Sequence, residues 1–237
     1  MKYLKKLLFS LKEIIIAYIL QYILIIISCI LLKIITNKSL SYIINNYIPY
    51  IMIIFTLFLT IYLYKKNKRT EPKIITTYII PYISIGISIS CLLNMLIFKY
   101  LIITLTHSTI NILTLIISSG LIGPIYEEIL FRYILLNKLK KFNNPNLAIL
   151  INSLIFALIH FNITKIIYAF LLGLIINVTY HKRKNILYPI IIHSSANITA
   201  IFLNNYNHNI LLLSLICLII NCYIIINNKS NIYNINL

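Results

Sequence analysis

The chain has 237 residues, of which 60% are hydrophobic and 11% charged, and its mean hydropathy is +0.93. This composition excludes an ordinary soluble protein and indicates a polytopic membrane protein. The formal net charge of +17 would suggest nucleic-acid binding in a soluble protein. In a membrane protein, lysines mark cytoplasmic loops and contact anionic lipid, so we expect the lipid bilayer and no nucleic acid as partner.

Apolar runs of about 17 to 25 residues recur along the chain, each about long enough to cross a bilayer. They predict an all-α fold, a multi-pass transmembrane helix bundle of about eight spans in the cell membrane. We expect a single domain over residues 1–237. The predicted spans are 14–32, 47–64, 74–98, 124–140, 146–161, 165–180, 186–203 and 210–226.

Residues 101–119 are apolar enough to enter a membrane but are rich in hydroxyl side chains, and the Gly123-Pro124 pair that follows predicts a break. Charge decides how this segment is interpreted. If it does not cross, 16 of the 21 Lys and Arg lie on one side and four on the other. The positive-inside rule then places both termini in the cytoplasm. We therefore expect a re-entrant or interfacial helix near 101–119. The abundance of Ile, Asn, Lys and Tyr is typical of AT-rich bacterial genomes.

Acidic residues are scarce, and two of the four are adjacent. Glu127 and Glu128 are flanked by apolar residues within the predicted span 124–140, whereas Glu13 and Glu71 lie near lysines. A carboxylate at the centre of a membrane helix costs about 3 kcal/mol on insertion scales. The adjacent pair is therefore the first candidate for a functional site.

Polar side chains with helical spacing occur on three predicted spans. Glu128 and Arg132 are four residues apart, so they share one helix face and Arg132 can neutralise one carboxylate. Glu127 lies about 100° round the helix and would remain free to react. Two further pairs have the same spacing, Phe156 with His160 and His193 with Asn197.

These groups suit hydrolytic chemistry. A carboxylate with a nearby histidine can hold and deprotonate a water, and a second histidine with an asparagine can donate hydrogen bonds to an oxyanion. Glu127, His160 and His193 could instead bind a divalent metal such as zinc. The sequence contains no His-Glu-x-x-His motif. It also contains no Gly-x-Ser-x-Gly motif, so serine chemistry is not indicated.

The three motifs, Glu127-Glu128-x-x-x-Arg132, Phe156-x-x-x-His160 and His193-x-x-x-Asn197, occur in this order on hydrophobic segments. In wording and order they resemble the CPBP (Abi) family, intramembrane endopeptidases related to type II CAAX prenyl proteases. The resemblance covers about residues 116–203. Two positions depart from the family pattern, since Tyr133 and Asn177 stand where small residues are usual.

The resemblance implies a role for each motif residue. Glu127 would be the general base that activates water, and His160 would orient this water. His193 and Asn197 would stabilise the oxyanion, while Glu128 and Arg132 would support the site and Phe156 would pack beneath it. The resemblance implies a peptide or protein substrate, and it leaves glutamate and metal catalysis both open.

Other interpretations remain. The Glu128–Arg132 pair can be purely structural, and His160, or His193 with Asn197, can be polar contacts between packed helices. The sequence favours an intramembrane endopeptidase, with a part in bacteriocin maturation or self-immunity implied by the resemblance. The alternatives are a proton-coupled transporter, with Glu127, Glu128 and His160 as relay, and a non-catalytic membrane immunity or partner protein.

Overall fold

The computed structural model describes residues 2–72, 79–100, 111–203 and 207–227, and every regular element within these ranges is helical. The predicted all-α class is confirmed. The helices are α1 (Lys2–Thr36), α2 (Leu40–Lys66), α3 (Ile79–Tyr100), a central helix that runs from α4 to α6 (Ile112–Leu139), α7 (Pro145–Leu158), α8 (Ile163–Arg183), α9 (Leu187–Phe202) and α10 (His208–Asn227).

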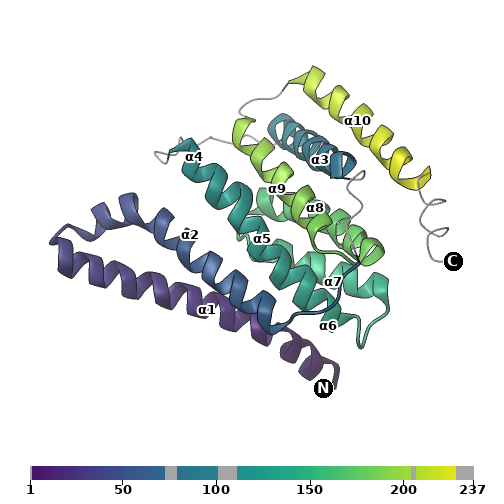
Figure 1. The fold of residues 1–237 in the computed structure, drawn as a ribbon. Helices are drawn as coiled ribbons and strands as arrows, with labels where there is room; N and C mark the ends of the chain where they lie inside the picture. The colour runs from purple at the N-terminus through teal and green to yellow at the C-terminus, as the bar shows by residue number, and fades with distance from the viewer. Residues whose placement is uncertain (1, 73–78, 101–110, 204–206, 228–237) are drawn as a thin grey trace.

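The central helix lies between two groups of helices (Figure 1). α1 packs along α2 on one side of it, and α9, α3 and α10 pack in that order on the other. α7 and α8 pack against each other and cover the back of the central helix. The middle of the bundle is therefore the stretch around the two adjacent glutamates.

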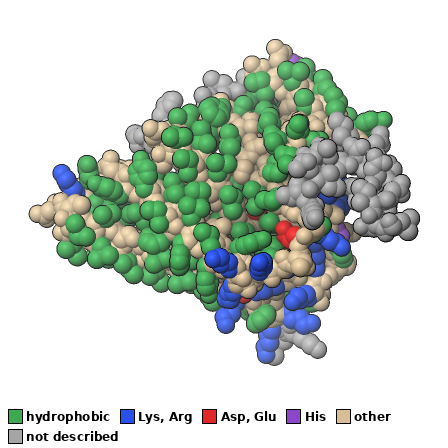
Figure 2. Space-filling model, viewed as in Figure 1, with side chains coloured by type: hydrophobic (Ala, Val, Ile, Leu, Met, Phe, Trp, Pro, Cys, Tyr) green, Lys and Arg blue, Asp and Glu red, His purple; other side chains and the backbone are tan. Residues whose placement is uncertain are grey.

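Five of these helices are long and apolar enough to cross a membrane, namely α1, α2, α3, the central helix and α8. Three shorter apolar helices lie at 145–158, 187–202 and 208–221. Large apolar side chains cover the outer surfaces of α1 and α2, as expected for helices that face lipid (Figure 2). The chain is thus a membrane protein with a helix at each of the eight predicted spans, and length alone supports five crossings.

The predicted break at Gly123-Pro124 is wrong, because residues 112–119 belong to the same helix as residues 124–139. The helix continues past Pro124 because a π-helical segment, η2 (Ile116–Ile122), precedes it. At the end of this segment the Gly123 N–H donates to Ser118 O, five residues earlier. Pro124 has no N–H to give, and the Asn197 side chain donates to the carbonyl of Ser119 instead, at 2.9 Å. Residues 101–110, the rest of the expected re-entrant helix, lie outside the described residues.

Three basic segments that are far apart in the sequence meet at one end of the bundle, which we call the basic end: residues 65–69, 138–141 and 182–184. The backbone N–H of Arg69 donates to the Tyr133 hydroxyl at 2.8 Å, and the Arg69 guanidinium lies 4.5 Å from the centre of that ring. Lys140 lies over Tyr180, with 5.6 Å from its ammonium to the ring centre. The positive-inside rule makes this the cytoplasmic end, which stays a prediction.

Candidate active site

Glu127 lines a cavity of about 840 Å³ in the half of the bundle away from the basic end. Its side chain is 25% exposed, and along the central helix it lies about 16 Å from Lys138 at 1.5 Å per residue. His160, two residues after the end of α7, and Asn197, on α9, line the same cavity. The structure thus brings one residue from each of the three motifs to a common space.

A buried chain of polar contacts lies behind Glu127. Glu128 is fully buried, and its Oε1 accepts from Arg132 Nη1 at 3.0 Å and from His193 Nδ1 at 2.7 Å. Because an ionised carboxylate only accepts, the His193 Nδ1 must carry the proton of that hydrogen bond. The other ring nitrogen, Nε2, then faces Glu127 Oε2 at 3.7 Å. Glu128 therefore fixes the orientation of His193 toward Glu127.

Arg132 supplies the positive charge that balances this buried carboxylate. Its side chain is also fully buried, and its guanidinium lies 4.2 Å from the centre of the Phe156 ring. Phe156 in turn makes edge contacts with His160 at 5.3 Å and His193 at 5.7 Å between ring centres. Phe156 thus contacts both histidines and the arginine, and the packing role expected for it stays a prediction.

The sequence prediction placed His160 beside the water, and the structure fixes only one of its ring nitrogens. Its Nδ1 lies 3.0 Å from the Phe156 carbonyl oxygen, so Nδ1 donates there and Nε2 remains available. Asn197 uses one amide N–H on Ser119 O. Its second N–H and its carbonyl oxygen remain for other partners, since a primary amide has two donors.

The first hundred residues, which the sequence showed only as topology, build the far wall of the cavity. α1 contributes Tyr18 and Gln21, and α2 contributes Asn45 and Thr56. Gln21 donates to Thr56 at 2.8 Å, which ties the two helices together beside the cavity. No periodicity pointed to these residues. A polar Gln and Asn on otherwise apolar helices were the available signal.

Both departures from the family pattern are accommodated by packing. Tyr133 is fully buried, and its hydroxyl accepts the Arg69 N–H described above. Asn177 donates to Ser153 at 2.8 Å and so joins α8 to α7. Gly173, one turn earlier on α8, leaves room for the site, because a Cβ there would lie 3.2 Å from the Phe156 ring. Each of the two larger residues therefore makes a hydrogen bond within the packed bundle.

The three candidate metal ligands, Glu127, His160 and His193, do not form a metal-binding group among the described residues. Glu127 Oε2 and His193 Nε2 face each other, but in the part of the chain that the structure describes no third His, Cys, Asp or Glu joins them to form a metal-binding group. A zinc site needs at least three protein ligands. We therefore derive no step through a metal ion.

Comparisons with known proteins match the part of the chain that carries the three motifs. Residues 109–199 match the family model of the Rce1-like type II CAAX prenyl endopeptidases. The match covers 91 of the 237 residues, so it describes a likeness of this segment. It contains all seven motif residues, from the Glu127–Arg132 motif on the central helix to Asn197 on α9. No solved structure matches the chain.

Three bacterial relatives each match about a third of this chain. The UPF0177 protein YxdF of Lactococcus lactis subsp. lactis (strain IL1403) is 38% identical over 80 residues, 33% of this chain and 44% of that protein. The "Putative membrane peptidase YdiL" of Bacillus subtilis (strain 168) is 35% identical over 83 residues, 35% of this chain and 34% of YdiL. The UPF0177 protein YbdJ of the same Lactococcus strain is 34% identical over 85 residues, 35% of this chain and 36% of YbdJ. The chain spans less than half the length of each.

Proposed function

We propose that this protein is an intramembrane endopeptidase that hydrolyses peptide bonds with a water activated by Glu127. The observation that carries the proposal is the pairing of a partly exposed carboxylate in a cavity wall with a buried, oriented histidine behind it. The match of residues 109–199 to the Rce1-like family model supports the same activity.

The proposed reaction has two steps. Glu127 takes a proton from a water while the water oxygen attacks the carbonyl carbon of the peptide, and the carbonyl oxygen becomes an oxyanion. The free N–H of Asn197, and His193 through Nε2 when protonated, would stabilise this oxyanion, and His160 would orient the water. The C–N bond then breaks, and the proton on Glu127 passes to the leaving amine.

Glu128 and Arg132 take the supporting role in this proposal. Both side chains are fully buried, so neither can touch a substrate in the cavity. Their contribution is to hold the Nδ1 proton of His193 and thereby the direction of its Nε2. The walls of the cavity carry tyrosine and isoleucine side chains from α1 and α2, which suit a hydrophobic peptide segment.

We further propose a physiological setting in the processing of secreted peptides, such as bacteriocin maturation or self-immunity. A hydrophobic peptide that reaches the membrane can enter the cavity from the lipid between α1, α2 and the central helix. Both termini of the protein are placed in the cytoplasm in this proposal, so the cavity opens in the half of the bundle nearer the outside.

The test is cleavage of a diverse peptide pool by the detergent-purified protein, read by mass spectrometry of the products. Wild type is compared with Glu127→Gln, and with Glu13→Gln as the control that removes a carboxylate outside the cavity. Each is assayed with and without a chelator. Cleavage that is lost only in Glu127→Gln supports the proposal, and cleavage that survives the chelator supports the route without a metal.

Three results would contradict it. Equal cleavage by wild type and Glu127→Gln would remove Glu127 from the reaction. Proton flux into protein-containing vesicles that depends on Glu127, with no cleavage of any peptide, would instead favour a proton-coupled carrier. A function retained by Glu127→Gln in cells would favour a non-catalytic partner protein.

A further inference from the structure

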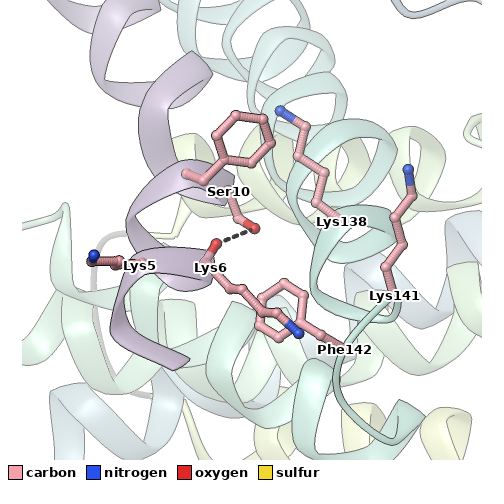
Figure 3. A pocket seen from close by; sticks show the side chains of 7 residues that line it. Lys5, Lys6, Ser10, Lys138, Lys141 and Phe142 are labelled. Carbon is pink, nitrogen blue, oxygen red and sulfur yellow. Dashed lines mark hydrogen bonds between the residues drawn. The ribbon is translucent and has the colours of Figure 1, made fainter. Parts of the chain in front are cut away.

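A second pocket lies at the basic end, between the first turns of α1 and the end of the central helix. We call it the lysine pocket, and its lining residues are Lys5, Lys6, Phe9, Ser10, Lys138, Lys141 and Phe142 (Figure 3). Its volume of about 510 Å³ falls in the usual range of ligand pockets, roughly 300–1,000 Å³. It is separate from the Glu127 cavity, because the two share no residue.

The lysine pocket is lined by four lysines, and this composition suits an anionic ligand. Figure 3 shows the Lys6 side chain extending from α1 toward Phe142, and the Lys138 and Lys141 side chains extending from the other side of the pocket in a different direction. Among the described residues, Lys138 alone of the pocket's four lysines has a carboxylate within ion-pair distance, Glu13 at 3.4 Å. The other three lysines have no carboxylate of the described residues within ion-pair distance. A bound anion would supply the negative charge that the described residues do not place beside these lysines.

The rest of the pocket is apolar. The ammonium of Lys6 lies 5.8 Å from the centre of the Phe142 ring, and that of Lys138 lies 5.7 Å from the centre of the Phe9 ring. Phe9 is 70% exposed, and the surface of α1 beyond it carries one exposed isoleucine or leucine after another. The pocket thus joins a cationic head region to an apolar track along a membrane helix.

Position decides between the anions that fit this chemistry. In Figure 2 the Lys and Arg side chains gather at the lower end of the molecule, beneath the apolar surface of α1 and α2. That is the depth at which lipid headgroups meet the helix ends. A soluble phosphate would use the lysines but leave the phenylalanines and the α1 track without a role.

We propose that the lysine pocket binds one anionic phospholipid of the surrounding membrane. Its phosphate lies among Lys6, Lys138 and Lys141, and its acyl chains run along α1 past Phe9. Because the pocket joins α1 to the central helix, the bound lipid holds α1 against the bundle. This site does not depend on the proposed peptidase activity.

The experiment measures lipid binding to the detergent-purified full chain by native mass spectrometry, with phosphatidylglycerol and phosphatidylcholine in separate titrations. The test variant is Lys6→Gln with Lys141→Gln, neither of which has an ion-pair partner among the described residues. The control is Lys33→Gln with Lys38→Gln at the opposite end of α1, which removes the same charge. Lys38 also lies over an aromatic ring, Tyr42 at 5.4 Å, as Lys6 does.

Phosphatidylglycerol is expected to bind at least tenfold more tightly than phosphatidylcholine. At about fivefold per lysine, the test variant should lose about 25-fold in affinity for it. The control variant should bind as wild type does, and phosphatidylglycerol should raise the unfolding temperature of wild type and of the control variant more than that of the test variant.

Three results would overturn the proposal. Equal binding of the two lipids would exclude recognition of an anionic head. Equal losses in the test and control variants would show diffuse attraction rather than a site. Displacement of the lipid by millimolar inorganic phosphate would show that the pocket holds a free anion and that the acyl chains contribute nothing.

Discussion

Replacement of Arg132 by methionine would leave the Glu128 carboxylate without its cation at the centre of the bundle. Both side chains are 0% exposed, and their atoms are 3.0 Å apart. Removal of one partner from such a buried pair typically costs about 3–5 kcal/mol, because the other charge stays buried and uncompensated. For a chain of this length each kcal/mol lowers the unfolding temperature by roughly 2–4 °C, so we expect Arg132→Met to lower it by about 6–20 °C.

The assay is thermal unfolding in detergent, with Glu128→Gln and the double variant beside Arg132→Met. The double variant removes both charges and keeps an amide oxygen that the His193 Nδ1–H can reach. It should therefore recover at least half of the loss. A shift below about 2 °C for Arg132→Met would refute the burial of the pair. A double variant less stable than the sum of the two single changes would refute the charge argument.

Three further predictions concern packing, titration and the bypass of the proline. Gly86→Ala should lower the unfolding temperature by several degrees, because the new Cβ would lie 2.4 Å from Ile192 O and force α3 from α9; unchanged unfolding would disprove this contact. Burial and neighbouring cations lower the pKa of Lys140 to about 8, so the unfolded state holds its proton to higher pH. Unfolding temperature should therefore rise from pH 8 to 10 in wild type and rise less in Lys140→Gln, whereas parallel pH curves would count against it. Asn197→Ala should cost about 1 kcal/mol, seen as a lower denaturation midpoint, because Ser119 O loses its donor.

Helix positions and motif faces could be predicted because they depend on local patterns. Apolar runs located the eight helices that the structure describes, and the four-residue spacing placed Arg132 beside Glu128 as the structure has it. The same reasoning left Glu127 on a different face, where it meets the cavity. Periodicity carries this information because residues four apart share a helix face whatever the fold.

The continuity of the central helix could not be predicted, because the partner that rescues it is 78 residues away. A local rule breaks a helix at Gly123-Pro124, but Asn197 supplies the missing donor across the bundle. The cavity wall from α1 and α2 was missed for a similar reason. Which face of an all-apolar helix turns inward depends on its neighbours and not on its own sequence.

The most direct test of the central claim compares peptide cleavage by wild type and Glu127→Gln. Both proteins must show the same unfolding temperature, so that a lower rate is not caused by lower stability. Loss of a general base typically reduces the rate about 10²- to 10⁴-fold. The account predicts a loss of this size in Glu127→Gln and an undiminished rate in Glu13→Gln. A Glu127→Gln variant that cleaves within a few-fold of wild type would contradict it.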